Sequence, residues 1–215
     1  DLGKWLRRPI YLYSLTVDGT QAYACTSEGV YKISAGWKHI SRIHHAKTAD
    51  IALDSAFIYM ATDEGLYRLP KTGKRGGGWI FSGVNVQTVF LDRQTGLLWA
   101  GTKHQGVLLY DRRKGRRVAA LSLETLPDKT CRSISGYDKQ TLLLGIDGEG
   151  VYAARRNGTA AWKLLSTEGS ADTRLMSNDI YDVLGDGNGN IWIGSEDGGL
   201  NCFNPRTGIF SFVTE

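Results

Sequence analysis

The stretch IWIGSEDGGLNCF at residues 191–203 decides how the chain folds, because the same phrase occurs four more times. Each copy has an apolar run, a small residue, a short polar turn, a glycine and a second apolar run. The other copies are AYACTSEGVYKI (22–33), IYMATDEGLYRL (58–69), LWAGTKHQGVLLY (98–110) and LLLGIDGEGVYAA (142–154). The equivalent glycines are Gly29, Gly65, Gly106, Gly150 and Gly199, at spacings of 36, 41, 44 and 49 residues. A repeated unit of this kind indicates that one structural module is used five times.

The composition favours strands over helices. The 215 residues include 27 glycines and only 4 prolines, which suits many tight turns. No window of a dozen residues keeps apolar positions at helical spacing without a glycine or a turn cluster. Hydrophobic residues make up 41% and the net charge is +4, as in a soluble globular domain. No apolar run approaches the roughly 18 residues of a membrane span.

The period of the repeat predicts an all-β chain, a β-propeller of four-stranded antiparallel blades. Strand A precedes a turn that holds an aspartate, the repeated phrase supplies strands B and C, and strand D follows a second polar turn. We expect the aspartates in these turns to be Asp18, Asp54, Asp92, Asp138 and Asp186. Strand D is predicted at 36–40, 77–81, 117–121, 161–165 and 209–213. The predicted blades cover approximately 10–40, 48–82, 86–121, 131–165 and 179–213.

A sixth D-like strand occurs at the N-terminus, in residues 3–8. The sequence thus has six D-like strands but only five sets of strands A, B and C. This count favours a five-blade segment of a larger propeller, as a single domain over 1–215. The alternative is a closed five-bladed ring, in which 3–8 would compete with 209–213 for one sheet edge. The first residue is Asp1, so we expect any signal or anchor segment to have been removed.

Three cysteines, Cys25, Cys131 and Cys202, are too few and of the wrong parity for a disulfide framework. Each lies in an apolar strand context, so we predict buried free thiols. The strand tryptophans Trp99 and Trp192 are likewise interpreted as core residues.

Strand alternation separates two sets of turns. The B–C turns and the D-to-A connections lie at one end of the blades, here called the upper end, and the A–B and C–D turns lie at the lower end. The upper B–C turns are predominantly acidic, whereas the lower C–D turns are rich in Lys and Arg. Loops on a rigid scaffold commonly carry function, so ligand contacts are predicted at the upper end. The candidates are His44, His45, His104, Arg174 and Asn178, with Glu28, Glu64 and Glu149 as acceptors for hydroxyl groups; simple loop polarity is the other interpretation.

Other chemistry is poorly supported. Carboxylate pairs such as Asp63/Glu64 recur at the same turn in several blades, which indicates a structural role and predicts no catalytic residues. The segment from Asp186 resembles the start of a calcium loop but has Ile191 where glycine is needed, and no histidines lie at metal spacing. GKRGGG (73–78) lacks the ending of a phosphate-binding loop, and RRKGRR (112–117) lacks interleaved aromatics for nucleic acid. No cofactor, metal or nucleic acid is therefore expected.

Residues 175–213 resemble the two-component-regulator propeller repeat of bacterial hybrid histidine kinases. The match includes the Leu-x-Ser-Asn lead-in, the Asp-rich turn before Ile191-Trp192, the paired Gly198-Gly199 and the Thr-Gly turn before Phe210. Residues 91–110 resemble it nearly as well, and the other blades keep only the [AG]-x-x-x-Gly-[VL] half.

The resemblance implies a periplasmic sensor region of an inner-membrane protein, attached to the membrane only through segments outside this chain. In that family two seven-bladed propellers and a small β-sandwich form a homodimer that passes a glycan signal to a cytoplasmic kinase. The chain would then be a non-enzymatic module that senses an oligosaccharide for polysaccharide utilisation. Two alternatives stay open: a propeller lyase or glycoside hydrolase, and a protein-docking scaffold that uses the basic lower edge.

Overall fold

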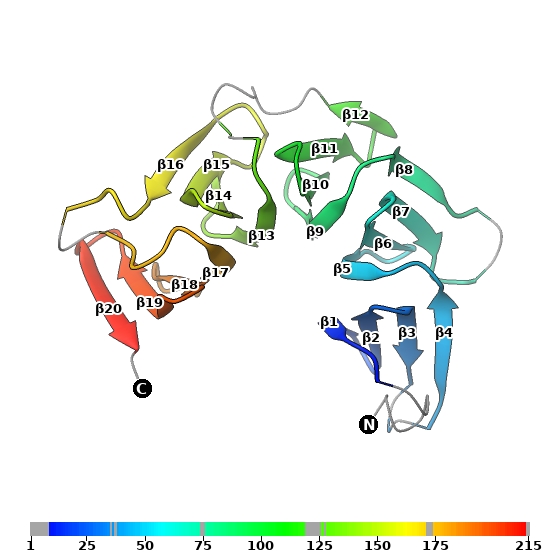
Figure 1. Cartoon of the computed structure of the whole chain (residues 1–215). Coiled ribbons are helices and arrows are strands. Elements are labelled where there is room, and N and C mark those ends of the chain that lie inside the picture. The colour runs from blue at the N-terminus through cyan, green and yellow to red at the C-terminus, as the bar shows by residue number, and fades with distance from the viewer. Residues whose placement is uncertain are drawn as a thin grey trace. The chain divides into compact units, whose positions relative to one another are not determined.

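The computed structural model describes residues 9–34, 36, 38–73, 76–118, 126, 128–170 and 174–213. Its elements are twenty β-strands in five four-stranded antiparallel sheets (Figure 1). In every sheet the strands lie side by side in chain order. The prediction of an all-β chain with five four-stranded modules is therefore confirmed.

The sheets are numbered in chain order. Sheet 1 contains β1 (Leu12–Asp18), β2 (Gln21–Thr26), β3 (Gly29–Ile33) and β4 (Ile40–His44), and sheet 2 contains β5 (Thr48–Leu53), β6 (Phe57–Thr62), β7 (Gly65–Pro70) and β8 (Gly78–Ser82). Sheet 3 contains β9 (Val86–Leu91), β10 (Leu97–Thr102), β11 (Val107–Asp111) and β12 (Arg116–Val118). Sheet 4 contains β13 (Cys131–Gly136), β14 (Thr141–Ile146), β15 (Gly150–Arg155) and β16 (Ala161–Leu165), and sheet 5 contains β17 (Ile180–Gly185), β18 (Ile191–Ser195), β19 (Gly199–Asn204) and β20 (Ile209–Val213).

The chain forms two compact units, Asp1–Val89 and Phe90–Glu215, here called the N-terminal and the C-terminal unit. The boundary falls within β9. Sheets 1 and 2 belong to the N-terminal unit, and sheets 4 and 5 belong to the C-terminal unit with β10, β11 and β12 of sheet 3.

Neighbouring sheets within each unit pack face to face. In the N-terminal unit Tyr23 and Val30 of sheet 1 share a cluster with Ile51 and Met60 of sheet 2. In the C-terminal unit Trp99 is buried against sheet 4, and sheet 4 packs in turn on sheet 5 through a second cluster. Interdigitated apolar faces of this kind form the core of packed sheets.

The glycine of the repeated phrase has a steric reason. Gly29, Gly65 and Gly150 start the third strand of their sheets at φ values of +119°, +152° and +97°. A Cβ atom at these positions would lie 2.0–2.3 Å from a backbone carbonyl oxygen of the fourth strand. Only glycine allows this approach, so the repeated glycine marks the point where the third strand of a sheet meets the fourth.

The fourth strand of sheet 1 differs from the prediction. Residues 36–40 were expected to form it, but β4 covers Ile40–His44. Tyr31 pairs with Arg42 and Ile33 pairs with Ile40, so the pairing register with β3 decides where the strand lies. Residue 37 of the predicted strand is outside the described residues. The predicted strand at residues 3–8 is outside the described residues, as are residues 119–121 of the strand expected at 117–121. Within the described part of the chain, no helix is long and apolar enough to cross a membrane.

Candidate functional site

The sequence-predicted ligand residues of the N-terminal unit lie near one another at the upper end. His44 ends β4 instead of lying in the following connection, which corrects the prediction. Its ring stacks on Tyr67 at 5.1 Å between centroids. Burial lowers the pKa of His44, His45 lowers it further, and Glu64 opposes both effects. His45 and Glu64 are exposed, and Glu28 is partly buried in the β2–β3 turn.

In the C-terminal unit the predicted residues serve different structural purposes. Asn178 accepts a hydrogen bond from the Thr167 backbone N–H at 2.9 Å and donates one to the Thr167 hydroxyl at 3.0 Å. The backbone carbonyl oxygen of Asn178 also accepts a hydrogen bond from the Gly150 N–H. Glu149 forms an ion pair with Lys163 at 2.9 Å. The amide of Asn178 is therefore engaged in fixing the connection before sheet 5.

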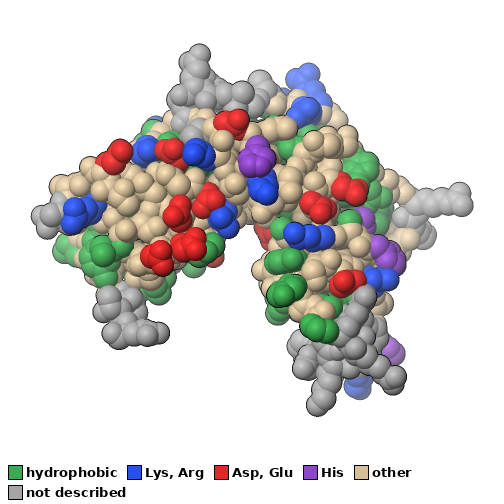
Figure 2. All heavy atoms as spheres, viewed as in Figure 1, with side chains coloured by type: hydrophobic (Ala, Val, Ile, Leu, Met, Phe, Trp, Pro, Cys, Tyr) green, Lys and Arg blue, Asp and Glu red, His purple; other side chains and the backbone are tan. Residues whose placement is uncertain are grey.

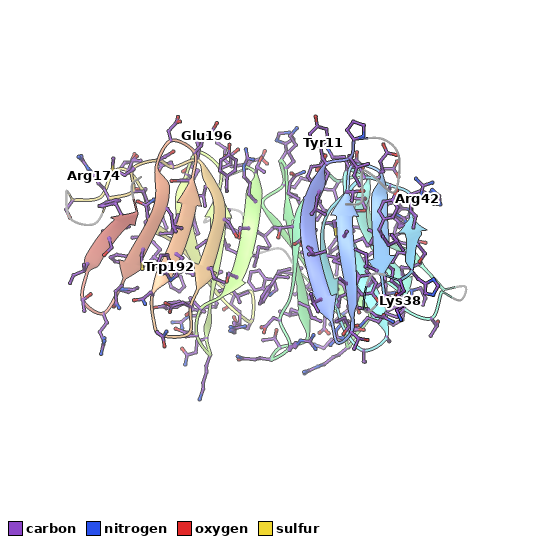
Figure 3. All side chains as sticks on the ribbon, turned by 90° about the horizontal axis from the view of Figure 1, so that it is seen from below. Tyr11, Lys38, Arg42, Arg174, Trp192 and Glu196 are labelled. Carbon is purple, nitrogen blue, oxygen red and sulfur yellow. The ribbon has the colours of Figure 1, made fainter. Side chains whose placement is uncertain are left out.

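His104 and Arg174 are exposed. His104 lies in the β10–β11 turn. Arg174 lies ahead of β17, and Figure 3 shows it and Glu196 at the same edge of the C-terminal unit. The structure thus places these two candidates at the surface but does not join them to Asn178 and Glu149 in one compact group.

A feature that the sequence analysis missed is a β-bulge near the start of the first strand of sheets 1, 2, 4 and 5, here called the inner strands. Pairing is interrupted between Leu12 and Ser14 in β1, between Thr48 and Asp50 in β5, between Cys131 and Ser133 in β13, and between Ile180 and Asp182 in β17. A bulge adds one residue to a strand and redirects its side chain. The extra residues are Tyr13, Ala49, Arg132 and Tyr181.

Two bulge residues of the C-terminal unit form a polar cluster, here called the bulge cluster, with carboxylates from the neighbouring upper turns. Arg132 lies over the ring of Tyr181, with Cζ 5.2 Å from the ring centroid, and forms an ion pair with Asp147 at 2.7 Å. The phenol of Tyr181 is hydrogen-bonded to the carboxylate of Glu196, which raises the pKa of Tyr181. The hydrogen bond with Asp147 raises the pKa of Arg132, so its positive charge is firmly held.

The bulge cluster stays accessible although its members are paired. Tyr181 is 50% exposed, and the Arg132 and Asp147 side chains are 37% and 27% exposed. Figure 2 shows acidic side chains interspersed with Lys, Arg and His over the face that it views. An accessible aromatic ring beside a guanidinium and two carboxylates suits a neutral ligand rich in hydroxyl groups, because the ring contacts C–H groups while the charged groups exchange hydrogen bonds.

The predicted aspartates of the lower A–B turns are structural. Asp54 accepts hydrogen bonds from two backbone N–H groups and from the Tyr59 hydroxyl, each at 2.7 Å. Asp186 accepts bonds from Asn188, Asn190 and the Trp192 indole, and these contacts lower its pKa to about 2. These donors occupy the carboxylate that the calcium-loop pattern would require. Among the described residues, no group of three or more His, Cys, Asp or Glu side chains is arranged to hold a metal ion.

The lower end also has a basic groove of about 390 Å³ in the C-terminal unit. Arg156 in this groove is held by Asp92 at 2.8 Å and by the Asp138 carbonyl at 2.7 Å. Three cationic side chains, Lys139, Arg155 and Arg156, line the groove, which agrees with the basic character predicted for the lower turns and can attract anionic groups. Its lining residues are Thr95, Lys139, Gln140, Arg155, Arg156, Asn157 and Thr159.

The predictions about buried strand residues are confirmed in part. Trp99, Cys25 and Cys131 are fully buried, and all three cysteines are free thiols. Burial raises the pKa of the Cys131 thiol to about 12. Trp192 and Cys202 are only partly buried, so the prediction that they are core residues is wrong for this chain. Both lie on the face of sheet 5 that no other described sheet of the C-terminal unit covers.

Comparisons with known proteins agree with the repeat and the fold described above. The family model of the two component regulator propeller matches residues 174–197, which confirms the resemblance found in the last repeat. No curated protein matches the chain.

Solved structures share the fold at low sequence identity. The extracellular domain of BT3049 from B. thetaiotaomicron, described as a hybrid two component system, superposes with a TM-score of 0.72 at 20% identity, over 94% of this chain and 29% of that one. The extracellular domain of BT4673 from the same organism, described in the same way, gives 0.71 at 19% identity, over 91% and 27%. The computationally designed protein Ika8 gives 0.63 at 10% identity, over 90% and 58%.

The chain is therefore a β-propeller segment of five blades, similar to domains of hybrid two-component systems. It spans less than a third of the length of those two natural relatives. Because a designed protein shares the fold, the fold by itself assigns no ligand, and function has to be argued from the site.

Proposed function

We propose that the chain is a non-catalytic, ligand-sensing propeller module in the periplasmic region of a hybrid two-component histidine kinase. The matched repeat at 174–197 and the extracellular neighbours support a sensor region. The proposed ligand is an oligosaccharide, and the proposed output is control of polysaccharide utilisation. Other propeller and β-sandwich domains of the parent polypeptide and a second protomer are the proposed partners.

The bulge cluster is the observation that carries the ligand proposal. Arg132 and Tyr181 project from the ends of paired inner strands, which are more rigid than loops and hold a binding geometry better. The Tyr181 ring offers a surface for the apolar face of a sugar. Asp147 and Glu196 offer acceptors, and Arg132 offers donors, for its hydroxyl groups.

Signalling in this proposal depends on two states of the parent receptor. A ligand shifts an equilibrium only by its difference in affinity for the two states. The upper end changes its hydrogen bonding when a sugar replaces the Arg132–Asp147 or Tyr181–Glu196 contacts, and this exchange would favour one packing of the neighbouring domains.

A thermal-shift screen of the complete extracytoplasmic region against defined oligosaccharides tests the proposal. Binding to the native state adds RT ln(1 + [L]/Kd), about 2.7 kcal/mol at a hundredfold excess over Kd. We expect a selective shift that Arg132→Ala removes and that Lys139→Ala, in the basic groove, leaves in place. A panel without any shift, or a shift that Arg132→Ala does not alter, would reject the oligosaccharide site.

A further inference from the structure

The basic groove of the C-terminal unit lies where the lower turns of sheets 3 and 4 meet. Thr95 comes from the β9–β10 turn, Lys139 and Gln140 come from the β13–β14 turn, and Arg155 ends β15. The groove volume of about 390 Å³ is within the range of about 300–1,000 Å³ that is typical of small-molecule sites. No described residue that lines the groove is acidic. The groove therefore has the size of a small-molecule site and a cationic wall.

One of its three cations, Arg156, has a structural role that repeats in the fold. Its Nη1 donates to the carboxylate of Asp92 at 2.8 Å, and the two side chains are 11% and 1% exposed. Lys71 has the same place directly after the third strand of sheet 2, and it pairs with Asp18 of the preceding sheet at 2.6 Å. The charge of Arg156 is therefore balanced by Asp92, and this contact joins neighbouring sheets.

Lys139 and Arg155 are not part of this repeated contact. The residues of the other sheets that take the place of Arg155 are Ser34, Pro70, Asp111 and Asn204. Those that follow the turn aspartate, as Lys139 does, are Gly19, Ser55, Arg93 and Gly187. Only sheet 4 has a cation at both places. Both side chains are exposed, and among the described residues neither has an ion-pair partner.

The hydrogen bonds inside the groove leave mainly donors available. Asn157 Oδ1 accepts from the Thr159 N–H at 3.1 Å and from the Thr159 hydroxyl at 2.7 Å. Gln140 Oε1 accepts from Arg155 Nη1 at 2.9 Å. Both amide carbonyl oxygens are thus engaged. The amide NH₂ groups of Asn157 and Gln140, the Lys139 ammonium and the other terminal N–H groups of Arg155 have no acceptor within the described part of the chain.

A ligand that offers only acceptors fits these donors best. A phosphate group has three strong acceptor oxygens and a charge of about −1.5 to −2 at pH 7, which matches the two unpaired cations. A carboxylate has two oxygens and one charge, so it would use fewer of the donors. A neutral hydroxyl group would bring a proton for which the groove offers few acceptors.

We propose that the basic groove is a binding site for a phosphate group, either free or carried by a small molecule. Gln140 and the Trp162 ring, 5.6 Å from Arg155 Cζ, hold the Arg155 guanidinium in place. Its planar fork can bind two phosphate oxygens at once. Lys139 adds a charged donor from the β13–β14 turn, and the Asn157 amide adds a neutral one. The proposal does not rest on the sugar site at the bulge cluster.

Calorimetric titration of the complete extracytoplasmic region tests this site. The probes are inorganic phosphate, glycerol 3-phosphate, acetate and glycerol, at pH 7.5 and low ionic strength, because salt screens exposed charges. We expect saturable binding of both phosphate probes, at least tenfold weaker binding of acetate, and no binding of glycerol. Glycerol 3-phosphate that binds at least tenfold more tightly than inorganic phosphate would identify a phosphorylated small molecule as the ligand, and equal or weaker binding would identify free phosphate.

Matched variants locate the binding. Lys139→Gln and Arg155→Gln should each weaken phosphate binding at least tenfold, whereas Lys139→Arg keeps the charge and should stay within about threefold of wild type. Lys129→Gln is the control, because it removes the same charge from an exposed lysine in the connection between sheets 3 and 4. It should leave phosphate binding unchanged. If Arg155→Gln lowers Tm, the comparison of Lys139→Gln with Lys139→Arg decides.

Four results would overturn the proposal. The first is the absence of saturable binding of either phosphate probe. The second is acetate binding as tight as phosphate binding, which means unselective attraction of anions. The third is an equal loss of affinity in Lys129→Gln and Lys139→Gln, which means that only the net charge matters. The fourth is phosphate binding that Lys139→Gln and Arg155→Gln leave unchanged, which means that phosphate binds elsewhere.

Discussion

The hydrogen bonds of Asp50 predict a large loss of stability in Asp50→Ala. The substitution leaves the Ile51 and Val89 N–H groups without their acceptor, and both residues are at most 5% exposed. A buried donor left unsatisfied costs about 1–3 kcal/mol, so two of them cost about 2–6 kcal/mol. The Ser14 and Thr88 hydroxyls can rotate toward other acceptors and add less.

The assay is thermal and urea unfolding of wild-type protein and variants, followed by circular dichroism. For a chain of this size each kcal/mol lowers Tm by about 2–4 °C, so Asp50→Ala should lower Tm by at least about 4 °C. Asp63→Ala, an exposed residue in the β6–β7 turn, is the control and should stay within about 0.5 kcal/mol of wild type.

Asp50→Asn separates charge from hydrogen bonding. Burial raises the pKa of Asp50, and its four hydrogen bonds oppose this effect. The folded protein therefore binds this proton more tightly than the unfolded chain, and the contribution of Asp50 to stability decreases as pH rises from its ordinary pKa of 3.8 through the raised value. Asp50→Asn should remove that decrease. An Asp50→Ala variant within about 1 kcal/mol of wild type would refute the reasoning.

Three further predictions concern the core, the lower turns and the bulge cluster. Trp99→Ala should cost about 3–5 kcal/mol in urea unfolding, because Trp99 is fully buried between sheets 3 and 4; a loss below about 1 kcal/mol would contradict this packing. Asp186 has its pKa lowered to about 2, so its contribution is complete above its ordinary pKa of 3.8 and is lost as pH falls toward 2; acid unfolding of Asp186→Asn should be flatter over this range, and an unchanged profile would count against the turn contacts. Tyr181→Phe should make the sugar-induced thermal shift smaller without abolishing it, because the ring remains and only the hydroxyl group is lost; a complete loss would mean that the ring without its hydroxyl group does not support binding.

Much of the fold could be predicted because its determinants are local. The repeated glycine is required where the third strand passes a carbonyl oxygen of the fourth, as at Gly29, Gly65 and Gly150, and Gly106 and Gly199 share its positive φ. The turn aspartates at 54, 92, 138 and 186 recur because their carboxylates accept hydrogen bonds from N–H groups of their own turns. The fourth strand was harder to place, because it lies at the sheet edge and β4 is fixed by its pairing register with β3.

The bulge cluster was missed for a different reason. Arg132 and Tyr181 are far apart in the chain, and each is an ordinary polar residue in a short strand. The signal was present as a break in alternation, since Cys131-Arg132-Ser133-Ile134 and Ile180-Tyr181-Asp182-Val183 both place two polar residues between apolar ones. Aligning the inner strands of the repeats would have indicated a bulge at this position. The contact between Arg132 and Tyr181 itself depends on how sheets 4 and 5 pack.

Calorimetric titration of the complete extracytoplasmic region with the oligosaccharide that gives the largest thermal shift tests the sensor account most directly. The account predicts saturable binding that Tyr181→Ala weakens at least tenfold, while Trp162→Ala, which removes another exposed ring of the C-terminal unit, leaves the affinity unchanged. Equal affinity in the wild type and Tyr181→Ala would contradict the assignment of the bulge cluster as the ligand site.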